Sequence, residues 1–354
     1  MRRIIDICSY VVNFVIASIL ILSFVACGDS KDSKQGLANQ SGNDNKVYVV
    51  KFAHVVSSGT PKGKAADFFA KRAEELSNGR LKVEVFPSAQ LVDDDKVFTE
   101  LKRNNVQMAA PSFSKFTPIV KEFNIWDIPF LFRDNEHLHK IMDGDIGEFL
   151  KSKVTEKGFV ALDYWDSGFK HFSTNKKPIV VPDDAKGQKM RIMSSKILEE
   201  QTKAVGATPQ VMNFGEVYSA LQTGVVDSAE NPLSNLYNSK FYEVQNSITL
   251  SNHGYLGYLV IVSEKFWKEL PDNLKDIFKQ ALHEATLFER EETQRDEVLL
   301  LKNLEDYAQK SGKLQIVLLT PEQKEQWRDV MFAIYPKFYD VVSEDLITKI
   351  QNVE

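Results

Sequence analysis

Cysteine is nearly absent from the sequence, and its scarcity excludes several kinds of chemistry. Cys8 and Cys27 are the only two cysteines among 354 residues. If an N-terminal signal is removed directly before Cys27, the processed chain keeps a single cysteine, which cannot form an internal disulfide. A lipid on that residue would also exclude a thiolate nucleophile and a cysteine-ligated metal.

Motifs of nucleotide-binding and catalytic sites are missing as well. The sequence contains no G-x-x-x-x-G-K-[ST], no G-x-S-x-G and no H-E-x-x-H pattern. It therefore shows no P-loop, no nucleophile elbow and no metalloprotease helix. No pairing of a base with a nucleophile is evident either. We expect no cofactor, no metal and no catalytic residue, so a binding module is favoured over an enzyme.

The chain also lacks a strong charge of one sign. Its formal net charge is -5, without long acidic or basic blocks. This gives no electrostatic footprint for nucleic acid and no polybasic patch for a membrane surface. The 43% hydrophobic and 26% charged content is that of a globular protein. At this length, two α/β lobes are expected.

The N-terminus has the pattern of an export signal. Arginines precede an uncharged run at 7–26, ICSYVVNFVIASILILSFVA, which ends directly before Cys27. The segment FVAC resembles a bacterial lipobox, in which the cysteine is lipidated and the signal removed, although Phe24 replaces the usual leucine. We predict a lipoprotein-type signal peptide over 1–26. A permanent transmembrane anchor is the alternative, because a run of about 20 residues can span a membrane.

The next segment, 27–46, is small and polar: CGDSKDSKQGLANQSGNDNK. Such a composition cannot bury a core and predicts a flexible tether. The folded body is therefore expected to begin at Val47 and to lie outside the cytoplasm, in the periplasm or an equivalent extracytoplasmic space, held to the membrane through lipidated Cys27.

The folded body opens with the pattern of a β-α-β unit. VYVVKFAHVV is rich in β-branched residues, KAADFFAKRAEELSNG has helical apolar spacing and ends at Gly79, and RLKVEVF alternates. This order predicts parallel strands joined by a right-handed crossover.

An internal repeat indicates two related lobes. VFTELKRNNVQMAAPS, from Val97, and VYSALQTGVVDSAENP, from Val217, align without a gap. In each copy a residue suited to the αL conformation, Asn104 or Gly224, falls where the helix must end, and a short strand follows.

Two facing lobes of this kind would enclose a ligand cleft. Open α/β sheets bind ligands beyond the carboxyl ends of their strands, and a hinged cleft that closes on a solute is the arrangement of periplasmic receptors. From Pro271 an apolar helical pattern continues to Gly312, which predicts a long helix bridging both lobes. The expected boundaries are 47–167 with 257–296 for lobe I, and 168–256 with 297–350 for lobe II.

Arg191 is the first candidate for a ligand contact. KMRIM predicts a buried strand, and Ser194 and Ser195 are suitable N-caps for the helix that follows. Arg191 therefore lies near a strand end, where a cleft would be. A guanidinium with no acidic neighbour in the sequence is suited to a two-pronged bond with a ligand carboxylate. A structural ion pair with a distant acidic residue is the alternative.

Several long segments of the folded body carry a resemblance: KFAHVVSSGTPKGKAA, YWDSGFKHFS, QVMNFGEVYSALQTGVVDSAENPLSNLYNSKFYEVQNSITLSNHGYLGY and ELPDNLKDIF. Together with Arg191, they resemble the substrate receptors of tripartite ATP-independent periplasmic (TRAP) transporters. The resemblance is to the C4-dicarboxylate-binding branch and covers nearly the whole folded body. Lys170 stands where the sialic-acid branch has arginine, which also favours the dicarboxylate branch.

The resemblance implies a function and a set of ligand contacts. The protein would bind a small organic acid, a C4-dicarboxylate such as malate, succinate or fumarate, and deliver it to a sodium-driven TRAP permease. Arg191 would clamp the ligand carboxylate, Asn231 of ENP would form a hydrogen bond with it and Phe214 of NFGEVY would pack on it. Lys170 is a further candidate at the site.

The residues themselves give partial support. Asn213 and Glu216 form an N-x-x-E pattern, which predicts a cap for a helix opened by Phe214, and free N–H groups there would favour an anion. A core aromatic is the alternative role for Phe214, and a turn residue is the alternative for Asn231. Lys170 could equally be a solvated surface lysine.

A dicarboxylate needs a second cation for its other end. Lys62 in TPKGK and His54 at the end of the first strand are the candidates from the opposite lobe. Ser112 of APS, which aligns with Pro232 in the repeat, would donate a hydrogen bond. Each of these three residues could instead shape its own turn.

Other functions stay open at this level. The cleft could belong to an extracytoplasmic enzyme acting on a carboxylic acid, or to a receptor for a different organic acid. A sensor subunit that presents its closed form to a signalling partner is a further possibility.

Overall fold

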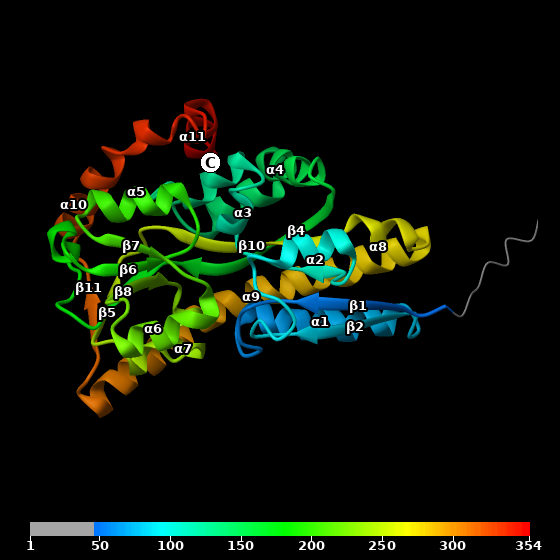
Figure 1. Cartoon of the computed structure of the whole chain (residues 1–354), viewed down its shortest axis with the longest axis horizontal. Coiled ribbons are helices and arrows are strands. Elements are labelled where there is room, and N and C mark those ends of the chain that lie inside the picture. Colours follow the sequence, from blue (N-terminus) through cyan, green and yellow to red (C-terminus); the bar gives the residue numbers. More distant parts are fainter. Residues whose placement is uncertain (1–45) are drawn as a thin grey trace, which may run out of the picture. The chain divides into compact units, whose positions relative to one another are not determined.

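The computed structural model describes residues 46–354. The predicted signal peptide (1–26), the lipidation site Cys27 and, apart from Lys46, the predicted tether lie outside the described residues. The described chain forms two mixed β-sheets accompanied by helices (Figure 1). The prediction of a two-lobed α/β fold is therefore confirmed.

The first sheet belongs to lobe I and has the order β2-β1-β3-β10-β4. Its elements are β1 (Tyr48–Ala53), β2 (Leu81–Phe86), β3 (Met108–Ala109), β4 (Phe159–Phe169), β10 (Tyr255–Ser263) and the crossover helix α1 (Pro61–Leu76). β1 pairs in parallel with β2 and β3, whereas β10 runs antiparallel to β3 and β4. The predicted β-α-β opening is thus confirmed.

The second sheet belongs to lobe II and has the order β11-β9-β5-β8-β6-β7. Its strands are β5 (His171–Thr174), β6 (Lys189–Ile192), β7 (Thr208–Val211), β8 (Ser228–Asn231), β9 (Ser247–Leu250) and β11 (Gln315–Leu318). β6 pairs in parallel with β7 and β8, and β11 pairs in parallel with β9, whereas β5 is antiparallel to β8 and β9. Pro209 lies in β7, an edge strand, where its missing N–H does no harm.

The remaining elements connect and cover these strands. The α-helices are α2 (Val97–Arg103), α3 (Asn135–Asp143), α4 (Asp145–Thr155), α5 (Lys196–Ala204), α6 (Val217–Thr223), α7 (Leu233–Asn238), α8 (Glu264–Glu269), α9 (Asp272–Ser311), α10 (Pro321–Phe332) and α11 (Glu344–Gln351). The short 3₁₀ helices are η1 (Phe113–Phe116), η2 (Lys121–Asp127), η3 (Pro182–Ala185), η4 (Phe214–Glu216), η5 (Phe241–Glu243) and η6 (Tyr335–Phe338).

The internal repeat corresponds to the same structural unit in each lobe. Asn104 ends α2 at φ 61° and Gly224 ends α6 at φ 73°, both in the αL conformation. The strands that follow, β3 and β8, each lie between one parallel and one antiparallel neighbour. Two lobes of related local topology, as the sequence predicted, therefore place equivalent strand ends opposite each other.

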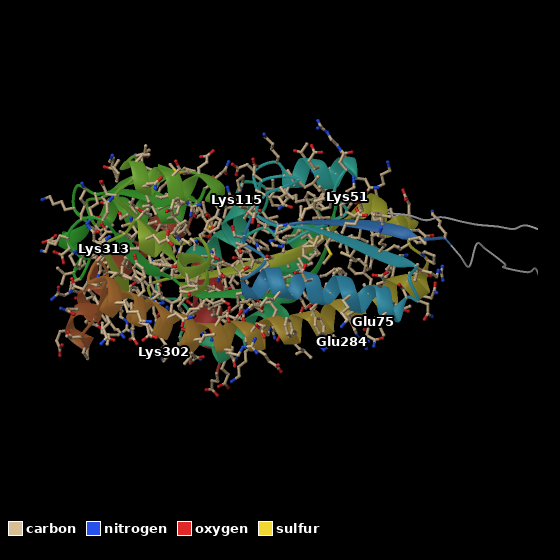
Figure 2. The ribbon with its side chains drawn as sticks, turned by 90° about the horizontal axis from the view of Figure 1, so that it is seen from below. Lys51, Glu75, Lys115, Glu284, Lys302 and Lys313 are labelled. Carbon is tan, nitrogen blue, oxygen red and sulfur yellow. The ribbon has the colours of Figure 1, made fainter. Side chains whose placement is uncertain are left out.

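One helix, α9, runs along both lobes. It spans 40 residues and ends at Gly312, which has φ 63°. It packs against α1 and β4 in lobe I and against α7 and β11 in lobe II (Figure 1). The predicted bridging helix is confirmed. Figure 2 shows charged side chains along α9, such as Glu284 and Lys302. No helix within residues 46–354 has the length and apolarity to cross a membrane.

The buried face of α9 changes character along its length. Phe278 and Leu282 belong to the larger apolar core, whereas Leu300 and Leu304 belong to a second, smaller apolar cluster. Between its contacts with these two apolar clusters, α9 has a section whose buried side chains are polar. The buried polar side chains of this section are Glu289, Glu292, Thr293 and Asp296. Because buried carboxylates are costly without partners, this section needs a counter-charge.

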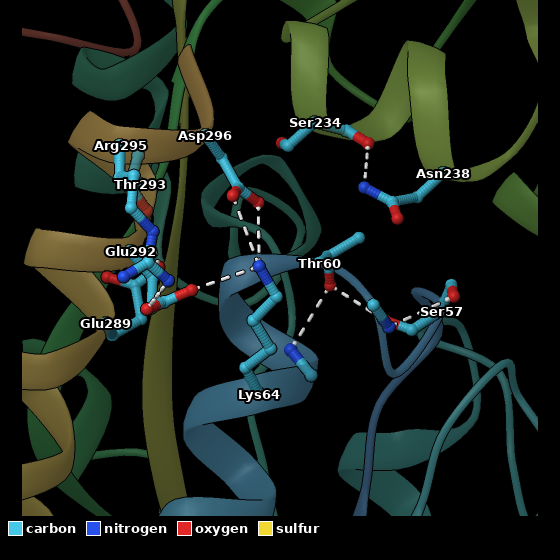
Figure 3. Close-up of polar contacts among 12 residues, drawn as sticks. Ser57, Thr60, Lys64, Ser234, Asn238, Glu289, Glu292, Thr293, Arg295 and Asp296 are labelled. Atoms are coloured by element: carbon cyan, nitrogen blue, oxygen red, sulfur yellow. Dashed lines mark hydrogen bonds and ion pairs between the residues drawn. The ribbon is translucent and has the colours of Figure 1, made fainter. Parts of the chain in front are cut away.

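Lys64 of α1 supplies that charge. Its Nζ lies 3.0 Å from Oε2 of Glu292 and 3.1 Å from Oδ1 of Asp296 (Figure 3). The side chain of Lys64 is 34% exposed, whereas both carboxylates are only 4% exposed. Arg295 also pairs with Glu292. The acidic middle of α9 is thus tied to the first helix of lobe I.

The chain crosses between the two sheets at two further places. β4 leads into β5 through Lys170, and β9 leads into β10 through 251–254. Both crossings fall close to the predicted lobe boundaries. The end of the chain, which was assigned to lobe II, reaches α3 of lobe I, because Nε2 of His137 lies 2.9 Å from the carbonyl oxygen of Ile350. The lobe boundaries themselves stay a prediction.

Lys64→Met should destabilise the fold, because Glu292 and Asp296 would remain buried with less counter-charge. Removing one partner of a fully buried ion pair costs about 3–5 kcal/mol. The partial exposure of Lys64 lowers our expectation to about 1–3 kcal/mol. Urea unfolding at neutral pH measures this difference.

Lys71→Met is the matched control, since Lys71 lies on the same helix with a side chain that is 79% exposed. Its unfolding should stay near that of the wild type. If both variants unfolded alike, the tie between α1 and α9 would carry no net stability.

Candidate functional site

A cavity of about 210 Å³ lies where strands of the two sheets end. Residues that follow β1, β3, β6 and β7, together with the end of β8, contribute to its wall. Ligands of α/β sheets bind at such carboxyl ends, so this is the cleft that the sequence predicted. Polar or aromatic residues in its wall are Asp93, Asp94, Ser112, Lys115 and Tyr258 from lobe I, and Arg191, Asn213, Phe214, Glu216, Asn231 and Asn235 from lobe II.

Arg191 lies in β6 and is 2% exposed. Its Nε and Nη2 donate to the carbonyl oxygen of Met212, at 3.1 and 2.8 Å, which orients the guanidinium. Burial lowers the pKa of Arg191 to about 10, although Glu230 and Asp94 act in the opposite direction. The group is therefore charged at neutral pH. Among the described residues it forms no ion pair with a carboxylate. The positive charge of Arg191 therefore faces the cavity without a carboxylate partner from these residues.

Asn231 and Phe214 complete one side of this wall. Asn231 ends β8 and is 3% exposed, and its Nδ2 forms no hydrogen bond with another described residue. The ring of Phe214 lies 5.9 Å from the guanidinium carbon of Arg191. It also meets Phe241 edge-on at 5.7 Å, so it has a packing role as well. Three of the four candidates predicted from lobe II, Arg191, Asn231 and Phe214, are therefore brought together.

The predicted N-x-x-E cap at Asn213 is wrong. Phe214 opens the 3₁₀ helix η4, and the side chain of Asn213 forms no cap bond with it. Instead, Oδ1 of Asn213 accepts from Nζ of Lys115 at 3.5 Å. The side chain is drawn across the cavity toward lobe I, which leaves the helix start without its cap.

Lobe I contributes Ser112 and, beside it, a cation that sequence reasoning missed. Oγ of Ser112 donates to the sulfur of Met193 at 3.5 Å, across the lobes. Lys115 lies one turn later in η1 (Figure 2), with a side chain that is 8% exposed and paired with Asp95. In a 3₁₀ helix, residues three apart lie on the same side. The spacing from Ser112 to Lys115 was the signal that could have identified it.

Lys62 and His54 lie behind the cavity wall. Neither residue lines the cavity, and each is 1% exposed. Burial lowers the pKa of His54 to about 3, and the charge of Lys62 adds to this shift. His54 is therefore neutral at neutral pH and does not fit the predicted role of second cation. Burial also lowers the pKa of Lys62, to about 8, so this lysine still carries its charge at pH 7.

Lys170 does not line the cavity either, because it is part of a buried ionic network at the strand crossings. Its Nζ lies 2.6 Å from Oε1 of Glu230, and Oε2 of Glu230 lies 2.8 Å from Nε2 of His253. Nδ1 of His253 in turn lies 2.7 Å from Oγ of Ser251. The geometry thus places Lys170 against a protein carboxylate. Glu230, which precedes Asn231 in the ENP motif, is a further residue that sequence reasoning missed.

A second, larger cavity of about 780 Å³ lies between α3, α4 and the segment around α11. None of the residues predicted for the ligand site lines it. Within residues 46–354, no cluster of His, Cys, Asp and Glu is placed to hold a metal ion. Of these two cavities, the smaller is therefore the candidate site, because it joins the strand ends with Arg191.

A two-lobed α/β fold with a buried cation in the cleft is the arrangement of a solute receptor. The chain belongs to the bacterial extracellular solute-binding proteins of family 7, whose model matches residues 52–341. The predicted resemblance to TRAP receptors is confirmed. This is a family of solute-binding receptors rather than of enzymes.

Individual relatives are similar over most of the chain. The C4-dicarboxylate-binding periplasmic protein DctP of Rhodobacter capsulatus is 42% identical over 304 residues, covering 86% of this chain and 90% of that protein. A TRAP solute-binding protein of Sulfurospirillum deleyianum, solved with succinate, is 59% identical with a TM-score of 0.86 and covers 87% of this chain and 100% of its own. Another from Pseudomonas aeruginosa, solved with L-malate, is 37% identical with a TM-score of 0.76, covering 82% and 99%.

Glu230→Gln should strongly destabilise the protein, because it leaves Lys170 buried without its counter-charge. The expected cost is about 3–5 kcal/mol. A double variant that also carries Lys170→Met should recover most of this loss, since no unpaired charge remains. Urea unfolding at neutral pH compares the three proteins, and a double variant as unstable as the single one would contradict the ion-pair account.

The same network predicts a pH dependence. Burial raises the pKa of Glu230, but Lys170 and His253 outweigh burial and hold the pKa at about 2, below its ordinary 4.5. The ionised carboxylate therefore stabilises the fold above pH 4.5, and this contribution is lost as the pH falls through about 2. The double variant should lose less stability than the wild type over this range.

Proposed function

We propose that this protein is an extracytoplasmic receptor that binds a C4-dicarboxylate, such as succinate, malate or fumarate, and delivers it to a sodium-driven TRAP permease. The observation that carries the proposal is the buried guanidinium of Arg191, which faces the cavity without an ion-pair partner among the described residues. The relatives solved with succinate and L-malate support the choice of ligand.

The site offers one group of contacts for each end of a diacid. In lobe II, the guanidinium of Arg191 would bind one carboxylate, Asn231 would donate to it and Phe214 would pack on it. From lobe I, Ser112 would donate a hydrogen bond, and Lys115, which is paired with Asp95, would add positive charge to that side of the site. Contacts from both lobes to one ligand would favour the closed arrangement over an open one.

Enclosure of the ligand is needed to reach useful affinity. Micromolar binding corresponds to about 8 kcal/mol. A four-carbon diacid has only about nine heavy atoms, so each must contribute near the ceiling for small ligands. Exposed ion pairs give about 0–1 kcal/mol. A cavity of about 210 Å³ with walls from both lobes removes the ligand from water and strengthens each polar contact.

Arg191→Ala should weaken the binding of succinate by about 100-fold or more, because a charged hydrogen-bonding partner of the ligand is removed. The fold should stay intact, since no protein carboxylate loses its partner. Arg191→Lys should also be damaging, because an ammonium cannot reproduce the planar fork. Titration calorimetry measures the affinities, and circular dichroism checks the fold; undiminished affinity in the alanine variant would refute the proposal.

The purified wild-type protein can also be used to distinguish the receptor function from an enzymatic one. Wild-type protein incubated with malate, succinate and fumarate should return each acid unchanged, partly bound. Formation of a product would support an extracytoplasmic enzyme acting on carboxylic acids.

We further propose that the protein is exported and anchored to the membrane by a lipid on Cys27, as the FVAC segment suggests. The relevant comparison is between wild type and Cys27→Ser, expressed in a bacterium that is supplied with a labelled fatty acid. The wild type should carry the label and sediment with membranes, whereas the variant should do neither. Equal labelling of both proteins would rule out Cys27 as the attachment point.

A further inference from the structure

Lys62 brings an unpaired positive charge to the back of the ligand cavity. It lies in the first turn of α1. Its Nζ donates to the carbonyl oxygen of Ala110 at 3.0 Å and lies over the ring of Tyr258, 3.4 Å from the centroid. Tyr258 lines the cavity, whereas Lys62 does not. The ammonium is therefore one side chain away from the position of a ligand.

Besides Tyr258 of β10, whose pKa is raised by burial, the charged and titratable groups that face Lys62 come from three other elements. They are His54 after β1, Asp94 in the loop before α2, and Glu289 on α9. Among the described residues, Lys62 forms no ion pair with a carboxylate. His54 is neutral, as shown above. Burial, with Asp166 nearby, raises the pKa of Glu289 well above its ordinary range, which weakens it as a counter-charge.

Lys115 differs from Lys62 in this respect. The Lys115 ammonium is already paired with Asp95, whose side chain is 49% exposed. Its charge is partly neutralised and partly screened by solvent. Lys62 is fully enclosed, and the Coulomb energy between two charges at a given distance is larger in a medium of low dielectric constant. Of these two cations from lobe I, Lys62 exerts the less compensated field on the cavity.

We propose that Lys62 is a second positive centre of the site whose protonation is linked to ligand binding: acting through Tyr258, it attracts the second carboxylate and sets the preference for doubly over singly charged acids. Lys62 is thus a specificity-determining residue that does not touch the ligand. The inference rests on the proposed function, because it assumes that an organic diacid occupies this cavity.

The direction of the pH effect follows from the environment of Lys62. Burial lowers its pKa from 10.5 to about 8, although Asp94 and Glu289 act against this. A dianion beside it would raise the pKa again. Near pH 7 the residue is mostly charged in both free and bound protein. Above about pH 8, Lys62 has lost its proton in the free protein but carries it in the complex. Binding of the dianion therefore takes up a proton, and the affinity for the dianion falls as the pH rises.

The test uses succinate and its monoamide, succinamate, which has nearly the same shape and one charge fewer. Titration calorimetry of the wild type at about pH 7 and about pH 8.5, in buffers of different ionisation enthalpy, measures affinity and proton uptake. Succinate should bind with little uptake at the lower pH and with substantial uptake at the higher pH. Succinamate should cause less proton uptake than succinate at both pH values. Arg191, with a pKa of about 10, stays charged throughout.

Lys62→Met removes the charge and retains much of the side-chain volume. It should reduce the preference for succinate over succinamate by about tenfold, the equivalent of one pKa unit, and abolish the proton uptake at about pH 8.5. Lys71→Met, an exposed lysine on the same helix, should match the wild type in both measurements.

Several outcomes would overturn the inference. If the wild type shows no proton uptake at about pH 8.5, Lys62 is not linked to binding, and this result needs no variant to fold. If Lys62→Met retains the full preference and only Lys115→Met loses it, Lys115 carries the second charge. If the wild type binds neither acid at either pH, the proposed function itself fails, which is distinguishable from a failure of Lys62 alone.

Discussion

The guanidinium of Arg191 is buried at the cavity, and no carboxylate among the described residues pairs with it. Arg191 is fixed by the carbonyl oxygen of Met212 and by its place in β6. Glu230, one strand away in β8, exerts an opposing charge on Arg191, yet its oxygens are taken by Lys170 and His253. The ionic network of Lys170, Glu230 and His253 therefore has a role at the site, because it occupies the carboxylate that could otherwise pair with the arginine. A solute that carries a carboxylate would therefore bind a guanidinium that is already removed from water and held in a fixed orientation.

Polar groups are buried at the strand crossings and along the middle of α9, although the larger apolar core includes residues of both predicted lobes, such as Phe52 and Ile192. The Lys170 network lies at both strand crossings, and the acidic section of α9 is paired with Lys64 between two apolar clusters. Closely packed apolar contacts have few alternative arrangements. Polar interfaces between domains are the ones at which relative motion is expected. The composition of α9 thus agrees with a cleft that opens and closes.

Much of this architecture could be predicted because its signals are local. The course of α9 follows from its apolar spacing and from Gly312, and the paired lobes follow from the repeat. Arg191 was recognisable as a charge inside a strand. The roles of His54 and Lys170 were not, since burial and a partner on a distant strand decide their charge state and pairing. Lys115 depended on a 3₁₀ turn that leaves little trace in composition.

The strand order has a consequence for how the protein is made. β10 lies between β3 and β4 in the first sheet, yet it comes after most strands of the second sheet in the chain. Lobe I therefore cannot complete its hydrogen-bonded ladder until residues 255–263 have been synthesised. Long-range pairing of this kind is slow to form. In a chain that is exported N-terminus first, lobe I would thus stay incompletely folded, and able to pass through a narrow channel, until late in synthesis.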